Sequence, residues 1–571
     1  MRAEAQVMEM EVQAEPRLPS TSALGLENSV SARISRLDFL LSKLALQKED
    51  GTWVESADWF AFYSLTENRL QASAEGVPAG KYKALRFEVG VPAAQDLADP
   101  NGLPPGHALH PLVNRLHWGW QGGYVYMALE GRWQKPGQTE SGFSFHLART
   151  PNRVPVVLKT GFQGGGPLTV RLGLDTARLF TGVDFEKDGN STHSREGDAV
   201  VAKLVRNVAQ SFRIVSVSQD LYQPAQSAEE TTVTATPPPP GTHAYPLDIT
   251  SRFPKVSLPA DNPLTREGVA LGKSLFHDVR LSVNNSQSCA SCHTRSYAFS
   301  DPRVRSLGAE GTEGRRHAMP LFNLAWAGSF FWDGRAGSLR EQVLRPIQDR
   351  HEMNERLDRV VAKLGDRDQD FAQAFGSPGI TADKIAKALE QYLLTLVTQE
   401  SRFDRAARKV DTLTEQEKRG LQLFVTEFDP ARGLRGADCF HCHGGTLFTD
   451  HQFKNNGLKL AGEDLGRMGV TGNAADRGKF KTPSLRNIAA TAPYMHDGRF
   501  ATLEEVVEHY SSGVQRSDTL DPNLAKHPDL GLQLTAGEKQ ALVAFLKTLT
   551  DDAFIRTAPE PARQRLAHRQ P

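Results

Sequence analysis

The sequence predicts a multidomain chain of 571 residues, in which an N-terminal all-β sandwich precedes two mostly α-helical domains that duplicate one another. Short alternating or β-branched runs, separated by Gly, Pro and Asn clusters, fill residues from about 10 to 220. From residue 246 the apolar periodicity becomes helical. Two stretches of this second half repeat the same residue pattern, which indicates a duplication.

The β-sandwich is predicted at 1–225. Six runs are typical of strands, and turn residues separate them as in a sandwich: 8–17, 34–41, 82–89, 123–129, 143–147 and 168–172. A polar, Pro-rich stretch at 226–245 predicts an extended linker. The two helical domains are predicted at 246–400 and 401–555, followed by a tail at 556–571.

Helix starts are marked by capping boxes, in which Ser or Thr precedes Glu by three residues. Four such boxes begin at Ser338, Thr414, Thr502 and Thr535. The periodicity predicts long helices over 382–397 and 537–549.

All four cysteines lie in two Cys-x-x-Cys-His strings, Cys289-Ala-Ser-Cys292-His293 and Cys439-Phe-His-Cys442-His443. This is the attachment signature of a c-type haem, in which the thiols form thioethers and the histidine ligates iron. A zinc knuckle or a redox dithiol is the alternative. Paired zinc motifs lie about 15–20 residues apart, and these two strings are much further separated. The sequence therefore predicts two covalent haems c in domains of cytochrome c type.

The two copies differ where the repeat aligns them. Phe331-Trp-Asp-Gly-Arg matches Met495-His-Asp-Gly-Arg, and Pro346 of the first copy then aligns with Tyr510 of the second. Proline offers no ligand, whereas a tyrosine phenolate binds ferric iron. We expect the first iron to be open to peroxide and the second to be closed by Tyr510. A packed tyrosine is the alternative, and the rival sixth ligands are Met319, Met353, Met468 and Met495.

Cleavage of a bound peroxide needs an acid–base group beside the open iron. His351 and Glu352 follow Pro346 closely and are the candidates. Trp332, whose counterpart in the repeat is His496, is expected between the haems as an oxidisable ring. The alternatives are a helix surface for the two polar residues and core packing for the tryptophan.

Composition excludes some classes of protein. The chain has 67 basic and 67 acidic residues, so nothing indicates a nucleic-acid partner. No apolar run reaches the ~18 residues of a membrane span.

Covalent haem attachment predicts export to the periplasm. Residues 1–30 lack a basic-then-apolar pattern, so we expect the signal peptide to be missing from this sequence.

Residues from about 246 to 550 resemble the bacterial dihaem cytochrome c peroxidase family, especially its MauG and MbnH branch. The resemblance rests on the Cys-x-x-Cys-His strings, Phe-Trp-Asp-Gly-Arg-Ala, Leu-x-Glu-Gln-x-x-x-Pro-Ile, His-Glu-Met and Thr-Ala-Pro-Tyr-Met-His-Asp-Gly. It implies a peroxidatic haem on His293 and an electron-transfer haem on His443. It further implies an inter-haem role for Trp332, a distal peroxide-site pair in Gln342 and Glu352, and calcium ligands in Thr491 and Pro493.

Three departures from the family pattern bear on activity. Ala309 stands where ordinary dihaem peroxidases carry a blocking distal histidine, and Tyr510 stands where they use methionine. The tyrosine is the MauG-like feature. His317 replaces the asparagine that helps to hold calcium, which makes calcium less secure than haem.

Residues from about 10 to 220 resemble the MbnP family of periplasmic copper-binding proteins. The strings that carry this resemblance are 34–42, Trp118-Gly-Trp120-Gln-Gly-Gly-Tyr124 and Phe143-Ser-Phe-His146-Leu. It implies that a tryptophan is oxidised to kynurenine, which then binds copper together with histidines. Trp118 and Trp120 are the candidate tryptophans. The candidate copper ligands are His117, His146 and His193, with His107 and His110 as rivals.

Together these features predict an enzyme that uses hydrogen peroxide to oxidise a tryptophan in its own fused N-terminal domain. One alternative is a peroxide-detoxifying enzyme that draws electrons from a cytochrome c or cupredoxin. Another is a copper-binding protein whose haems only carry electrons.

Overall fold

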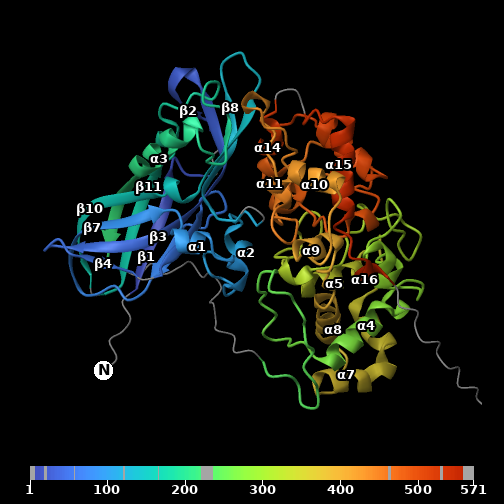
Figure 1. The fold of residues 1–571 in the computed structure, drawn as a ribbon. Coiled ribbons are helices and arrows are strands. Elements are labelled where there is room, and N and C mark those ends of the chain that lie inside the picture. Colours follow the sequence, from blue (N-terminus) through green and yellow to red (C-terminus); the bar gives the residue numbers. More distant parts are fainter. Residues whose placement is uncertain are drawn as a thin grey trace, which may run out of the picture.

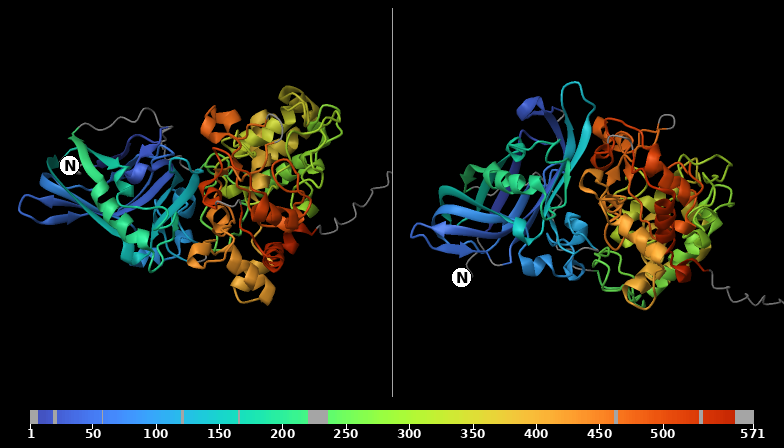
Figure 2. Two further views of the ribbon diagram at one scale, coloured as in Figure 1. Left: turned by 90° about the horizontal axis from the view of Figure 1, so that it is seen from above. Right: turned by 45° about the horizontal axis from the view of Figure 1, so that its top comes forward.

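The computed structural model describes residues 7–18, 22–56, 58–119, 122–164, 166–219, 236–460, 464–527 and 531–556. A β-rich module (blue to teal) and a helical module (green to red) lie side by side in every view (Figures 1 and 2). The sequence prediction of a β-rich N-terminal part followed by a helical part is confirmed. Residues 220–235, which include half of the expected linker, and 557–571 fall outside the description, so the domain boundaries stay a prediction.

The β-rich module consists of two sheets. The smaller has the order β13-β11-β1-β6, and the larger has the order β10-β7-β3-β8-β9-β12, with β2, β4 and β5 also paired to β3. β1 runs parallel to β11, whereas most other pairs are antiparallel. The strands are β1 Met8–Glu15, β2 Leu24–Gly25, β3 Ser31–Lys48, β4 Trp53–Glu55, β5 Phe60–Ser64, β6 Gln71–Ala74, β7 Gly80–Val89, β8 Val125–Gln134, β9 Ser141–Ala148, β10 Val154–Gly164, β11 Leu168–Asp175, β12 Ser191–Thr192 and β13 Phe212–Ser218.

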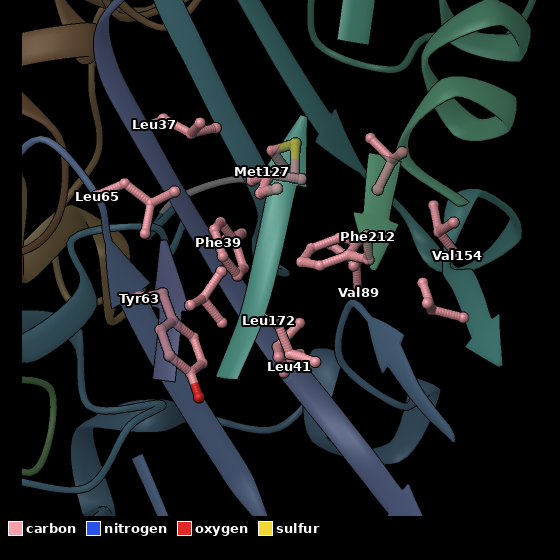
Figure 3. Packing of buried hydrophobic residues seen from close by; sticks show 14 of the residues in the cluster. Leu37, Phe39, Leu41, Tyr63, Leu65, Val89, Met127, Val154, Leu172 and Phe212 are labelled. Atoms are coloured by element: carbon pink, nitrogen blue, oxygen red, sulfur yellow. The ribbon is translucent and has the colours of Figure 1, made fainter. Parts of the chain in front are cut away.

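The core of this module lies between the two sheets (Figure 3). Phe39 of the larger sheet stacks on Tyr63 at 5.3 Å and meets Phe212 of the smaller sheet edge-on at 5.9 Å. The buried Tyr63 hydroxyl donates to the Met10 carbonyl of the opposite sheet at 3.0 Å. This hydrogen bond satisfies a hydroxyl group that would otherwise be buried without a partner. Burial of such large aromatic rings stabilises the sandwich most.

A helix in the β-rich module contradicts the expectation of an all-β domain. Helix α3 Ala199–Ser211 buries Val200, Leu204 and Val208, which are spaced four residues apart on one face. This 3.6-residue periodicity lies inside the stretch that we expected to contain strands alone, and it identifies an amphipathic helix.

The helical module contains two similar helix pairs. Helix α4 Arg266–Phe276 packs on α8 Ala382–Leu394, and α10 Glu415–Phe424 packs on α15 Ala536–Lys547. In each pair a glycine allows the close approach, since an added Cβ would lie 1.9 Å from the Ala388 carbonyl at Gly272 and 2.0 Å from the Ala541 carbonyl at Gly420. The predicted long helices are confirmed, although α8 ends before Val397 and α15 before Leu549.

The expected helix starts are observed. Thr414, Thr502 and Thr535 form complete capping boxes, and the Ser338 hydroxyl accepts from the Glu341 amide. The remaining α-helices are α1 Ala93–Asp96, α2 Pro111–Asn114, α5 Leu339–Gln348, α6 Leu357–Lys363, α7 Asp368–Phe375, α9 Arg402–Ala407, α11 Phe440–His443, α12 Met468–Thr471, α13 Leu503–Glu508, α14 Pro522–Ala525 and α16 Asp552–Ile555. None of the described helices is both long and apolar enough to cross a membrane.

A buried ion pair connects helix α9 to the loop after the second haem string. The fully buried Arg486 guanidinium donates to both Asp404 oxygens, at 2.8 and 2.9 Å, and its Nε donates to the Thr446 carbonyl. Asp404→Ala leaves this cation unpaired, so we expect it to lower the free energy of unfolding by about 3–5 kcal/mol. Asp358→Ala removes an exposed bidentate partner of Arg356 and should cost less than about 1 kcal/mol. Chemical denaturation measures both losses of unfolding free energy. Equal losses in the two variants would contradict the structural role of the buried ion pair.

Candidate functional site

A cavity of about 870 Å³ opens beside the first Cys-x-x-Cys-His string. Cys289, Cys292 and His293 line one part of it, and Gln342, Pro346 and Glu352 line another. Helix α5 carries Gln342 and Pro346, and the loop that follows carries Glu352. The structure therefore brings the predicted distal residues and the first haem string to one cavity, whose size suits a large planar ligand.

Both proximal histidines are oriented by a backbone carbonyl. Nδ1 of His293 lies 2.8 Å from the Phe299 carbonyl oxygen, and Nδ1 of His443 lies 3.1 Å from that of Phe448. This bond leaves Nε2 of each imidazole to ligate iron. None of the four cysteines forms a disulfide, and burial raises the pKa of Cys289 to about 12. The donor set fits two haems c.

Glu352 is suited to move protons in this cavity. Burial raises the pKa of its carboxyl group to about 7, and the charge of Asp349 adds to the shift, whereas Arg335 opposes it. A carboxyl group that titrates near neutral pH can both accept and return a proton. The Glu352 carbonyl is held by the Ala309 amide at 2.7 Å. His351 also lines the cavity, so it remains the second candidate.

Trp332 is buried where the first unit of the helical module, the predicted haem domain at 246–400, meets the second unit, the predicted haem domain at 401–555. Its indole N–H donates to the His317 carbonyl at 2.9 Å, and its own carbonyl accepts from the Lys481 amide at 2.7 Å. His496, its counterpart in the repeat, stacks on Phe480 at 3.6 Å. These contacts join a loop of the first unit to a loop of the second.

Tyr510 faces the second haem string from a π-helical turn, His509–Gly513. Burial raises the pKa of its phenol, and the nearby Cys442 and Cys439 thiols add to this shift. Its hydroxyl accepts from Asn456 Nδ2 at 3.3 Å. The same nitrogen lies 3.5 Å from Met495 Sδ, so Met495 remains a rival ligand, while Met319 and Met353 line the first cavity instead.

The calcium prediction receives no support from the contacts of His317. Its Nε2 lies 3.2 Å from Ser300 Oγ, and its Nδ1 lies 3.2 Å from the Arg303 carbonyl. Burial lowers the pKa of His317, and hydrogen bonds with the Val304, Arg303 and Thr491 backbones only partly oppose this shift. An imidazole is no substitute for the oxygen ligands that calcium requires. Calcium on Thr491 and Pro493 therefore stays a prediction.

Three histidines meet where the two modules join. His146 of β9 and His193, directly after β12, lie 4.9 Å apart between ring centroids. The third, His441, comes from the second haem string, 4.9 Å from His193 and 5.6 Å from His146. Burial lowers the pKa of His146 to about 3 and also lowers that of His441. Neutral imidazoles are ligands for copper, zinc and iron.

The expected copper set of His117, His146 and His193 is only partly brought together. The His117 ring instead packs edge-on against Tyr124 at 4.8 Å, and burial lowers its pKa to about 4. The rivals are outside the cluster as well: His107 packs on Phe60, and His110, which lines the same cleft as His146, bonds the Lys255 carbonyl. Among the described residues, His441 takes the third place.

His441 was missed because it sits inside a haem string. The first string has Ala290-Ser291 between its cysteines, whereas the second has Phe440-His441. This difference between the two copies was the available signal. The sequence difference gave no indication that the β-rich module would pack against the second haem string.

Trp118 lies beside the three histidines. Its ring centroid is 5.7 Å from that of His193, and both His146 and His441 line the same interface cleft of about 430 Å³. The next residue, Gly119, approaches Gly445 so closely that an added Cβ would lie 2.9 Å from its Cα. The second candidate, Trp120, falls outside the described residues.

Two haem strings, a distal carboxyl group and a fused β-sandwich define a dihaem c-type oxidoreductase. Residues 266–412 match the family profile "Di-haem cytochrome c peroxidase", and residues 6–194 match the profile "MbnP". The chain is 40% identical over 309 residues to the methylamine utilization protein MauG of Methylorubrum extorquens, covering 53% of this chain and 83% of that protein. It is 36% identical to the cytochrome c551 peroxidase of Nitrosomonas europaea, covering 51% and 83%.

A solved structure is also similar. A MauG-like protein associated with microbial copper homeostasis shares 34% identity at a TM-score of 0.50, covering 55% of this chain and 98% of that one. The chain belongs to the dihaem cytochrome c peroxidase family and carries an N-terminal MbnP domain. It is a MauG-like dihaem enzyme.

Proposed function

We propose that this enzyme uses hydrogen peroxide to oxidise Trp118 of its own MbnP domain to kynurenine. One observation carries the proposal: Trp118 packs on His193, and His193 packs on Phe440 at 5.4 Å and on His441 at 4.9 Å. A continuous row of rings therefore connects the oxidisable indole to the residues between the two haem-bearing cysteines.

The peroxide end of the reaction lies at the other haem string. Glu352 takes a proton from peroxide at its carboxylate and returns it to the departing oxygen as water forms. Gln342 lines the same cavity and would orient the peroxide, and Pro346, which also lines it, offers no side-chain ligand that would compete with peroxide. The bound haems supply the oxidising equivalents, and Trp332 places a buried ring between the two units.

The reaction balances with two molecules of peroxide. Removal of four electrons and addition of two oxygen atoms convert the indole to N-formylkynurenine, while the peroxide leaves as two molecules of water. Hydrolysis of the formyl group then releases formate and leaves kynurenine. The net change in the protein is one oxygen gained and one carbon lost.

Several features accompany this proposal. We propose that the two helical units arose by duplication, because they share a glycine-mediated helix crossing and the αL residues Asn323 and Asn487 at matching places. We further propose that the enzyme acts in the periplasm, that the modified residue binds copper together with His146 and His193, and that calcium joins the haem units.

Peptide mapping tests the function. The haem-loaded protein is treated with peroxide and digested, and each of its seven tryptophans is examined by mass spectrometry. We expect the oxygen gain and carbon loss at Trp118. A chain unmodified at every tryptophan, or modified elsewhere alone, would overturn the proposal.

Tyr510→Met tests the ligand of the second haem. Replacing an anionic oxygen by a thioether favours the reduced iron, so we expect the reduction potential of this haem to rise by on the order of 0.1 V or more. We also expect tryptophan oxidation to be lost. Tyr494→Phe is the matched control, because this buried tyrosine of the same unit bonds the Ile488 carbonyl instead. An unchanged potential in spectroelectrochemical titration of Tyr510→Met would show that Tyr510 is no ligand.

A further inference from the structure

Three buried ring nitrogens at the module interface lack a hydrogen-bond partner among the described residues. They are His146 Nδ1, His193 Nε2 and His441 Nε2. The side chains are 7%, 6% and 2% exposed, and ligand atoms of the three residues lie within 4.8 Å of one another. An unsatisfied buried polar group costs about 1–3 kcal/mol. Three such groups in one cluster indicate that a ligand satisfies them together.

Carboxylates hold the opposite nitrogens of two of these rings. His146 Nε2 lies 2.9 Å from Glu130 Oε1, and His193 Nδ1 lies 3.0 Å from Glu427 Oε2. Such a carboxylate accepts the ring N–H, so the unpartnered nitrogen carries the lone pair. This is the arrangement found around metal-binding histidines. Near His441 Nε2, Asp438 Oδ1 lies at 3.5 Å, which is too long for a hydrogen bond.

The supporting carboxylates cross the interface in both directions. Glu130 belongs to the β-rich module and accepts from Asn523 Nδ2 of the helical module at 3.3 Å. Glu427 belongs to the helical module, yet it holds His193 of the β-rich module. Arg432 and Asp198 add an ion pair across the same interface at 2.9 Å. Carboxylates from both modules therefore hold the His146 and His193 rings in place before any ion arrives.

We propose that His146, His193 and His441 together bind one copper ion, and that the second haem string thereby supplies a ligand to a site shared by both modules. Three imidazoles suit copper, and divalent copper binds most strongly in the first-row series. The cleft of about 430 Å³, lined by His146 and His441, gives an entry path. The inference deepens the proposed function by completing its copper site with a residue outside the MbnP domain.

This placement has a consequence for regulation. His441 lies between Cys439 and Cys442, the two residues that carry the second haem. A copper ion on His441 is therefore bonded to the same short segment that carries the second haem. Copper binding can change the surroundings of that haem through this segment. It also ties the two modules together, so copper binding stabilises the docked state by mass action.

The test compares His441→Gln with the wild type, both loaded with two haems and with the N-terminal domain attached. Each protein is titrated with Cu(II) in the presence of a chelator that removes weakly held ions. The bound metal is counted by elemental analysis, and the copper EPR spectrum reports the number of coordinated nitrogens. Haem absorbance and circular dichroism confirm that the variant is folded.

We expect one copper per wild-type chain with three coordinated nitrogens. His441→Gln should bind at least about tenfold more weakly and lose one nitrogen coupling. His451→Gln is the matched control, because this half-buried histidine of the same module lines the same cleft and has a buried, unpartnered Nε2, yet stands outside the cluster. It should bind copper as the wild type does.

Unchanged copper affinity and nitrogen count in His441→Gln would overturn the inference, and so would binding of zinc in preference to copper. Peptide mapping of the same samples separates this failure from failure of the proposed function. An unmodified Trp118 beside a three-nitrogen copper site would refute tryptophan oxidation alone. A modified Trp118 beside an unchanged site in His441→Gln would refute the role of His441 alone.

Discussion

Trp118→Phe should abolish peroxide-dependent modification of the N-terminal domain. Phenylalanine keeps a ring against His193 but is far harder to oxidise than indole. The variant therefore lacks the oxidisable group at the end of the row of rings. We expect the modified fraction of the domain to fall from near completion to background in mass spectrometry of the digested protein. Both haems should remain attached and should still react with peroxide, since Trp118 lies at the interface cleft rather than in the first haem cavity.

Trp133→Phe is the control for this prediction. Trp133 is a buried tryptophan of the same domain, and it stacks on Phe185 at 4.8 Å within the hydrophobic core. This variant should be modified at Trp118 as the wild type is. Persistent modification of Trp118→Phe at Trp120 would move the assignment to the second candidate.

Glu352→Gln should slow the reaction with peroxide by about 10²–10⁴-fold. Glutamine keeps the size and polarity of the side chain but cannot take the proton. Stopped-flow absorbance of the haems measures the rate directly. Glu313→Gln, an exposed carboxylate in a neighbouring loop, should leave the rate unchanged.

The pH dependence follows from the same carboxyl group. Burial raises the pKa of Glu352 to about 7, so the carboxylate that accepts the peroxide proton prevails only above that pH. The rate should rise as pH increases through about 7 and then level off, and Glu352→Gln should lose this inflection. A rate that falls over the same pH range would contradict the role of Glu352 as the base.

Much of the fold could be predicted because its signals are local. The Thr414, Thr502 and Thr535 capping boxes start helices through contacts within four residues, and the structure shows all three. The alternating strand at 8–17 and the strand at 168–172 were likewise expected, but their parallel pairing was not. Strand pairing depends on residues far apart in the chain, and the periodicity of one strand carries no information about its neighbour.

The candidate site likewise has one part that depends on local sequence and one part that depends on residues far apart in the chain. The distal group of Gln342, Pro346 and Glu352 follows from one helix and the loop after it, and the structure brings these residues to one cavity with His293. The histidine cluster depends on how two modules dock. The sequence therefore predicted His146 and His193 but chose His117 in place of His441. The contact between His193 and Phe440 could not be predicted, because it forms only when the modules dock.

The intact mass of the haem-loaded protein, followed through a peroxide titration with reduced cytochrome c present, tests the central claim most directly. If peroxide chemistry is aimed at Trp118, two molecules of peroxide are consumed per chain while the protein gains one oxygen and loses one carbon. The cytochrome c stays largely reduced. Rapid, sustained oxidation of the cytochrome c with no change in protein mass would contradict the account and identify an enzyme that detoxifies peroxide.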